Sequence, residues 1–222
     1  MNTLLAALPH LSPTFREKTA RLWVPEHIGR IARRVNEDRS DQPLPHFEAE
    51  ITPVVQPFAE RLRSVLSPSP IELAAELEHI GVDGLLLLLG QRRTPATLTD
   101  ERGIPPITDE LLASSSARFN PHNELTLAAR ALAKHAHRSP DRFWGEVSGP
   151  TTVRKARAVE LLTRILAGRT WWNVFGHFAH DTVFEARLPT GHGARWGHDG
   201  SEFIGFLEPF DAAKCPSLHM HE

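Results

Sequence analysis

The sequence has one cysteine, Cys215, and no tyrosine among its 222 residues. A single cysteine excludes an intramolecular disulfide and is typical of a reducing compartment. The longest apolar run, Leu85 to Leu89, is far shorter than the roughly 20 residues that span a bilayer. The first residues contain no basic segment ahead of their short apolar run, which predicts no signal peptide. We therefore expect a cytoplasmic protein with no membrane partner.

Several sequence motifs of known enzyme classes are also missing. No G-x-x-x-x-G-K-[ST] motif is present, and no G-x-G-x-x-G motif is followed by a ribose-binding acid, which excludes a P-loop and a dinucleotide-binding fold. The absence of G-x-S-x-G argues against an α/β-hydrolase, and the absence of H-E-x-x-H against a zincin protease. Cys215 lies near the end of the chain with no assignable base, so a thiol enzyme is not expected.

The residues that are present predict helices over most of the chain. Hydrophobic residues make up 41% and charged residues 23%, as in a globular protein, and 18 prolines interrupt the sequence. Prolines, capping residues and helical periodicity predict helices over 13–23, 25–38, about 57–66, 70–80, from 108, 123–137 and 151–168. Residues 91–106 read as a loop. The apolar block 81–90 fits either a buried strand or a buried helical turn.

The pattern changes after the aromatic stretch 170–178, which we expect in the core. TVFEARL (182–188) alternates in polarity, SEFIGFLEPF (201–210) is rich in β-forming residues, and the glycine-rich GHGARWGHDG (191–200) separates them. This order predicts a β-hairpin or small antiparallel sheet. The expected class is α+β: a mostly helical body with a C-terminal antiparallel element. We expect a helical region over 1–105 and a second region over 106–222, packed as one unit, with a loosely held tail from 211.

The small net charge of −2 conceals a basic middle of the chain. Residues 118–169 hold ten Lys and Arg against four Asp and Glu. On the predicted helix 123–138, an apolar stripe lies opposite a cationic face made of Arg130, Lys134, His137 and Arg138. This face is either solvated or a binding surface for anions, with His137 as its titratable member and candidate proton carrier.

The stretch SGPTTVRKAR (148–157) places cations at the start of a predicted helix. The positive end of a helix dipole normally favours acidic residues, with Thr151 or Thr152 expected as the cap. Glu124, Asp141 and Glu146 would neutralise the cations in one interpretation. In the other, an external anion binds between the backbone N–H groups and the side chains of Ser148, Thr151, Thr152, Arg154, Lys155 and Arg157.

Histidines are concentrated in the last quarter of the chain. His135 and His137 point about 200° apart on a helix and cannot share a metal ion, so His135 is expected to be a hydrogen-bonded residue at the edge of the apolar stripe. A divalent metal is a candidate cofactor at a second place, where His177 and His180 are three residues apart. His192 or His198 would supply the third ligand of such a site.

The glycine-rich stretch contains further candidate ligand-binding residues. Arg195 can bind a phosphate or carboxylate, and Trp196 can stack on a ring. Alternatively, Arg195 pairs with Glu185 or Glu202 and Trp196 packs on the helices. Glu208, at the end of a strand, is a candidate catalytic base or metal ligand.

These features give four functional hypotheses. The first is a protein that binds, and by acid–base chemistry converts, a small phosphate- or carboxylate-bearing ligand at a basic site between two helices and the hairpin. The second is a winged-helix-like nucleic-acid-binding protein, with 152–168 as the reading helix. The third is a metal-dependent hydrolase that uses the C-terminal histidines. The fourth is a non-catalytic interaction protein.

Overall fold

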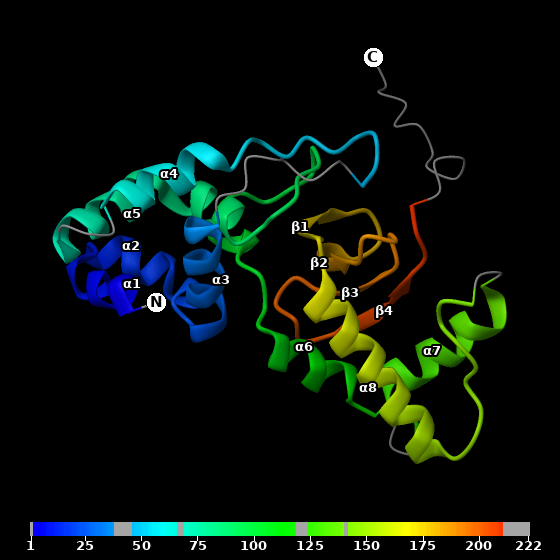
Figure 1. The fold of residues 1–222 in the computed structure, drawn as a ribbon. Helices are drawn as coiled ribbons and strands as arrows, with labels where there is room; N and C mark the ends of the chain where they lie inside the picture. Colours follow the sequence, from blue (N-terminus) through cyan, green and yellow to red (C-terminus); the bar gives the residue numbers. More distant parts are fainter. Residues whose placement is uncertain (1, 38–45, 66–68, 119–123, 140–141, 211–222) are drawn as a thin grey trace.

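The computed structural model describes residues 2–37, 46–65, 69–118, 124–139 and 142–210. Helices occupy most of the chain up to residue 168, and a four-stranded antiparallel sheet follows. The predicted α+β class is confirmed. Helices α1 to α5 gather on one side of the molecule, and the sheet with helices α6 to α8 lies on the other (Figure 1).

Prolines at the first helical position begin three helices of the first half, as predicted, and serines cap two of them. The short helix at residues 2–7 was not predicted. The Ser12 hydroxyl accepts a hydrogen bond from Phe15 N, and the Ser69 hydroxyl accepts one from Ile71 N, each ahead of a proline at the first helical position. The helix predicted over 13–23 is shorter than expected, because a separate 3-10 turn follows it. The five helices are α1 (Asn2–Ala7), α2 (Pro13–Lys18), α3 (Pro25–Asn36), α4 (Gln56–Val65) and α5 (Pro70–Leu88).

The apolar block after Gly81 is a buried helix. Gly81 has a φ of 69° inside α5, a left-handed conformation that favours glycine. It ends the helical segment 70–80, as predicted, and a second helical segment follows to Leu88 across the kink. Leu85 to Leu88 are buried against the helices of the first half, which resolves the ambiguity between strand and helix.

Three further helices pack against the sheet: α6 (Thr108–Ser115), α7 (Leu127–Arg138) and α8 (Thr151–Gly168). Helix α7 is capped by the Thr126 hydroxyl, which accepts from Ala129 N, so it begins later than predicted. Helix α8 has Pro150 at its N-cap position and no side-chain cap. The prediction that Thr151 or Thr152 caps it is therefore wrong, because both residues already belong to the first turn of the helix.

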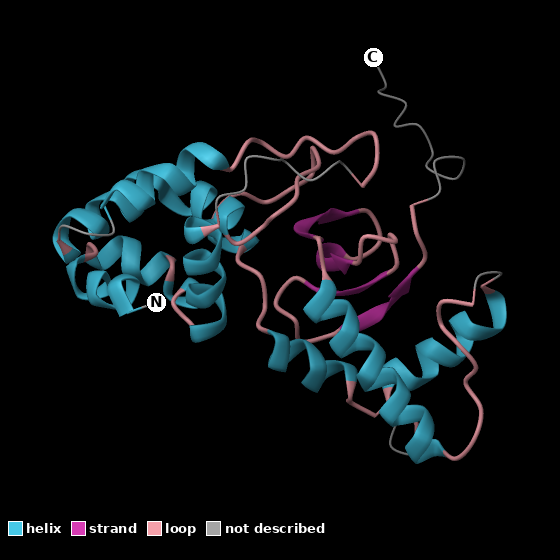
Figure 2. Ribbon diagram, viewed as in Figure 1, coloured by secondary structure: helices cyan, strands magenta, loops and turns pink. Residues whose placement is uncertain are grey.

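The sheet is an antiparallel meander of β1 (Trp171–His177), β2 (Asp181–Arg187), β3 (Gly193–Gly197) and β4 (Phe203–Leu207). The aromatic stretch that we expected in the core forms β1. Side chains alternate between the two faces: Phe184, Ala186 and Trp196 enter the hydrophobic core, whereas Glu185 and Arg195 lie on the opposite face. Figure 2 shows helices α6 to α8 against the strands.

The loop after α5 joins the first helices to the edge of the sheet. Arg92 N donates to Trp172 O at 2.9 Å, Leu98 N donates to Val174 O at 2.9 Å, and Gly176 N donates to Ala96 O at 3.0 Å. The division into regions 1–105 and 106–222 stays a prediction, and the tail from 211 lies outside the described residues. Within the described part of the chain, no helix is both long and apolar enough to cross a bilayer.

Candidate functional site

A carboxylate at the end of the sheet collects polar groups from three elements. Glu208 directly follows β4, and its Oε1 lies 2.9 Å from His135 Nδ1 on α7. Trp144 Nε1 donates to the same oxygen at 2.9 Å, and the Ser139 hydroxyl donates to Oε2 at 3.2 Å. His192, just before β3, places its Nε2 3.9 Å from Oε2. We call these five residues the Glu208 cluster.

The cluster is held in place by aromatic packing. Trp144 is buried, with its ring centroid 5.0 Å from that of His135 and 5.4 Å from that of His192. Phe143 stacks on His192 at 3.7 Å with an interplanar angle of 7°. The Arg164 guanidinium lies over the Phe143 ring, 4.9 Å from its centroid. The two histidines thus flank Glu208 in fixed orientations while the carboxylate remains 42% exposed.

A hollow of about 940 Å³ adjoins the cluster between the end of α7 and the start of α8. Ser139 and Trp144 both line it and contact Glu208. Arg154 also lines it, and the buried Nε of Arg154 has no hydrogen-bond partner among the described residues. Buried guanidinium N–H groups without a partner are costly, so this side chain is suited to a phosphate that enters the hollow.

A second polar group, which we call the sheet cluster, lies on the sheet face away from the helices. Arg195 donates from Nε and from its terminal nitrogen to Glu185 Oε2, at 2.9 and 2.7 Å. Arg187 donates to the other oxygen of Glu185. Arg195 also places its second terminal nitrogen 2.9 Å from His177 Nε2. Burial and the nearby Arg195 charge lower the pKa of His177, because both disfavour a charged ring.

Among the predicted basic residues of α7 and α8, those that line the hollow are His137 and Arg154. Lys134 and His137 are exposed on α7, and His137 lines the hollow. Arg157 pairs with Glu160 one helical turn later, at 2.9 Å. The other predicted members of this site stay predictions. Arg138 is the last residue of α7, Ser148 lies in the loop before α8, and the first two turns of α8 contain Thr151, Thr152 and Lys155.

Two residues predicted to join that site lie elsewhere. Trp196 is fully buried and donates from Nε1 to Leu111 O at 3.1 Å and to Ser115 Oγ at 2.9 Å. It packs on the helices and cannot stack on a ligand, so the alternative interpretation of Trp196 is the one observed. Arg195 lies on the other face of the sheet and pairs with Glu185. This pairing is the alternative to ligand binding that the sequence indicates for Arg195. The alternation of side chains along β3 separates both from the α7–α8 cations.

The three-histidine metal site is not formed. His177 and His180 do lie together, with ring centroids 5.2 Å apart. His192, however, stacks on Phe143 in the Glu208 cluster. The described residues contain no group of three His, Cys, Asp or Glu side chains arranged to hold a metal ion.

Sequence reasoning finds Glu208 but misses most of its partners. The sequence predicts a hydrogen-bonded His135, and the structure confirms it, but the partner lies at the end of a strand 73 residues away. Trp144 and His192 join the cluster through tertiary packing, for which the local sequence carries no periodic signal. Buried Glu185 and Arg187 are recognisable only as a polar alternation in β2.

A family model described as the CdiA C-terminal tRNase toxin domain matches residues 113–208. This segment, which is less than half of the chain, runs from the end of α6 to Glu208 and contains both clusters. No curated protein and no solved structure matches the chain.

The similarity to a nuclease toxin corrects the functional hypotheses drawn from the sequence. Binding of a small phosphate- or carboxylate-bearing ligand is wrong as the main function, and none of the three alternatives describes a toxin. The winged-helix interpretation fails on the fold as well, since the C-terminal strands form a four-stranded sheet that packs against the helices and not a separate hairpin.

Proposed function

We propose that residues 113–208 form a ribonuclease domain that cleaves tRNA and thereby acts as a toxin. The observation that supports this proposal most strongly is that the family match and the Glu208 cluster involve the same residues. The segment that resembles a tRNase toxin domain supplies all five members of the Glu208 cluster. That cluster holds two histidines on one carboxylate, which is a suitable arrangement for proton transfer.

The chemistry that fits the cluster is attack by the ribose 2′-hydroxyl on the adjacent phosphate. His135 takes the 2′-hydroxyl proton on its second ring nitrogen, while Glu208 holds its Nδ1–H and stabilises the resulting imidazolium. The 2′-oxygen forms a bond to phosphorus and the bond from phosphorus to the 5′-oxygen breaks. His192 donates a proton to that leaving oxygen. The products are a 2′,3′-cyclic phosphate and a 5′-hydroxyl.

In this mechanism, Arg154 and the neighbouring cations bind the RNA backbone. Arg154 lines the hollow beside Ser139 and Trp144, so its guanidinium can stabilise negative charge on the attacked phosphate. Lys134, exposed on α7, and the half-buried Lys155 on α8 add positive charge on the two helices that border the hollow. Contacts of this kind supply affinity for nucleic acid independently of its sequence.

The sheet cluster is assigned a structural role in this proposal. The Glu185 side chain is 1% exposed, and its two oxygens are occupied by Arg187 and Arg195. Because both oxygens already accept hydrogen bonds from these guanidinium groups, neither is available to a substrate hydroxyl. Buried ion pairs of this kind fix a fold more readily than they move protons.

A tRNA-cleaving toxin also implies a protein partner. Cleavage of tRNA would stop translation in the cell that makes the enzyme, so that cell requires an inhibitor that binds this domain. The substrate lies in the cytoplasm of the cell that is attacked, and this is where we expect the domain to act.

The experiment is an in vitro cleavage assay with the purified chain. We expect the chain to cleave a tRNA pool and leave 2′,3′-cyclic phosphate and 5′-hydroxyl ends, which are identified by phosphatase and kinase treatment of the products. A tRNA whose cleaved nucleotide carries 2′-deoxyribose is the matched control and should resist. Intact tRNA after prolonged incubation at high enzyme concentration would contradict the proposal.

A further inference from the structure

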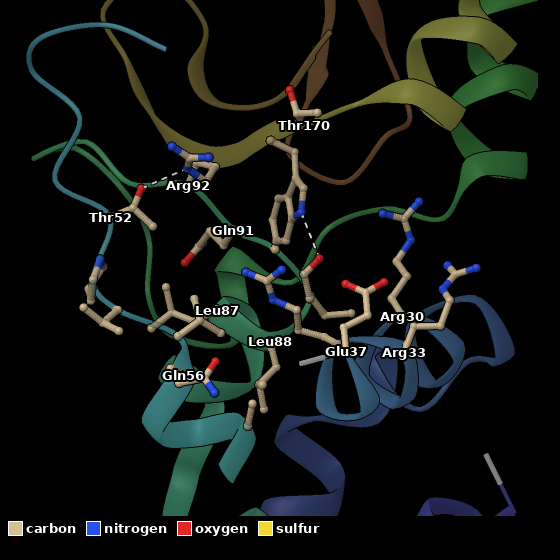
Figure 3. A pocket seen from close by; sticks show the side chains of 18 of the residues that line it. Arg30, Arg33, Glu37, Thr52, Gln56, Leu87, Leu88, Gln91, Arg92 and Thr170 are labelled. Carbon is tan, nitrogen blue, oxygen red and sulfur yellow. Dashed lines mark hydrogen bonds between the residues drawn. The ribbon is translucent and has the colours of Figure 1, made fainter. Parts of the chain in front are cut away.

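A pocket lies between the first helices and the start of the sheet, and most of its lining comes from outside the segment that resembles the toxin domain. Its volume is about 420 Å³, within the range of ligand-binding pockets. Leu87, Leu88 and Val55 provide an apolar wall, and Trp172 of β1 lies beside them. Figure 3 shows Arg30 and Arg33 side by side on α3, across the pocket from Thr52.

The charges that line this pocket are predominantly positive. Among the described residues of the lining, two carboxylates, Glu37 and Glu50, face five arginines: Arg30, Arg33, Arg34, Arg92 and Arg169. Glu50 is already engaged, because Arg92 forms a buried ion pair with it and Thr52 donates to it at 2.7 Å. Arg30 and Arg33 place two positive charges on the α3 side of the pocket.

Two of these arginines, the partly exposed Arg30 and the buried Arg169, each have a buried N–H group without an acceptor among the described residues. Arg30 and Arg169 share Glu26 Oε1, each at 3.3 Å. The Nε groups of both are buried and have no hydrogen-bond partner in the described part of the chain. The Arg169 side chain is only 5% exposed, and burial together with the Arg30 charge lowers its pKa to about 9. A second negative group at this position would accept hydrogen bonds from the unpaired Nε groups, and it would also stabilise the charged form of Arg169.

The pocket and the Glu208 cluster lie at the same end of the sheet. Arg169 and Thr170 lead into β1, and Glu208 leaves β4, with Trp171, Arg187, Gly193 and Leu207 in register across the four strands. Three strand spacings of about 4.8 Å separate β1 from β4 at this end. A single RNA strand that passes over this edge can therefore reach both.

We propose that this pocket binds a phosphate of the RNA substrate together with its attached nucleoside, and that Arg30 and Arg33 hold the phosphate. The proposal rests on the proposed nuclease function and assigns part of substrate binding to the first helices. The exposed Val54 side chain on the apolar side of the pocket packs against the nucleoside, and the guanidinium groups of α3 face the phosphate. Bidentate hydrogen bonding makes arginine well suited to this contact.

The test measures tRNA binding by fluorescence anisotropy at several salt concentrations, in the cleavage-deficient His135→Asn background. We expect Arg30→Gln and Arg33→Gln each to weaken binding about fivefold to tenfold. Each should also reduce the slope of log affinity against log salt by about one, because one phosphate contact is lost. Arg16→Gln, an equal change of charge at an exposed position of α2, is the matched control and should bind as the parent does.

The outcomes separate this inference from the proposed function. Arg33 is exposed, so its variant keeps the test valid even where loss of the Glu26 pair unfolds Arg30→Gln. Affinity and salt slope equal to those of Arg16→Gln would overturn the pocket as an RNA site, and so would absence of tRNA binding by the parent. If tRNA is cleaved while these variants bind normally, the nuclease assignment stands and only the pocket fails.

Discussion

His135 and Glu208 are 73 positions apart in the sequence, yet Nδ1 of one lies 2.9 Å from Oε1 of the other. The pair joins the last turns of α7 to the end of β4, and the Trp144 indole donates to the same carboxylate oxygen. A histidine oriented in this way keeps its second ring nitrogen for proton exchange with a substrate. The proposed nuclease chemistry depends on this pairing.

The buried ion pairs of the sheet cluster predict a large loss of stability when their carboxylate is neutralised. Glu185→Gln leaves Arg187, whose side chain is 4% exposed, and Arg195 without a counter-charge. We expect the free energy of unfolding to fall by about 3–5 kcal/mol, as for other buried pairs that lose one partner. Urea denaturation followed by circular dichroism measures it.

The matched control for that experiment is Asp100→Asn. Asp100 pairs with Arg102 on the surface, with side chains 42% and 67% exposed, and such solvent-exposed pairs contribute little to stability. Equal losses in the two variants would show that burial of the Glu185 pairs has no energetic consequence.

Two glycines of the sheet should differ in how much their replacement by alanine changes the stability of the fold. A Cβ at Gly193 would lie 2.2 Å from the backbone oxygen of Ala186, whereas a Cβ at Gly205 meets nothing within 4 Å. Gly193→Ala should therefore destabilise the fold by about 1–3 kcal/mol, as overpacking does, and Gly205→Ala should change stability by less than about 0.5 kcal/mol. Thermal unfolding of both proteins provides the comparison, and a similar melting temperature for the two would refute it.

His27 predicts a specific dependence of stability on pH. It is 2% exposed, and burial lowers its pKa, although the Arg21 carbonyl at 3.0 Å and the Glu26 charge act in the opposite direction. The folded protein therefore keeps His27 neutral under conditions where the unfolded chain, with a pKa of about 6.5, already binds a proton. Stability should fall as the pH drops below about 6.5.

The measurement is the free energy of unfolding in urea at several pH values between about 7 and 5. In His27→Gln the decline should be shallower, because the variant binds no proton at this position. The pKa values of His46 and His177 are also lowered. Part of the decline in the free energy of unfolding at low pH therefore remains in both proteins. His10→Gln changes an exposed histidine and serves as the control. Parallel curves for His27→Gln and the parent would contradict the assignment.

Local signals predict most of the helices and the class of the fold. Prolines and capping serines mark the starts of α2, α3 and α5, because their effect on the backbone needs no tertiary contact. The number of strands is underestimated for a physical reason. Strand β1 is apolar along much of its length, since one face packs on the helices and Trp171 is buried on the other. Such a run has no alternation to detect.

The candidate site is less predictable from the sequence than the fold. Glu208 stands out as a carboxylate at the end of a strand, but the helical pattern favours His137, which faces the hollow, over His135 as the proton carrier. Which histidine meets Glu208 depends on how α7 packs against β4, and a helical wheel does not contain that information. Arg30 and Arg169 of the pocket are even further apart in the sequence, and only the fold brings both to Glu26.

The sharpest test of the Glu208 cluster as the active site is the single-turnover rate of tRNA cleavage in three variants. We expect His135→Asn and Glu208→Gln to be at least about a hundredfold slower than the parent, as for the loss of a general base and of the group that orients it. His177→Gln, which changes the sheet cluster, should stay within about threefold. Unimpaired cleavage by His135→Asn and Glu208→Gln, together with loss of activity in His177→Gln, would move the active site to the sheet and contradict the proposed role of Glu208.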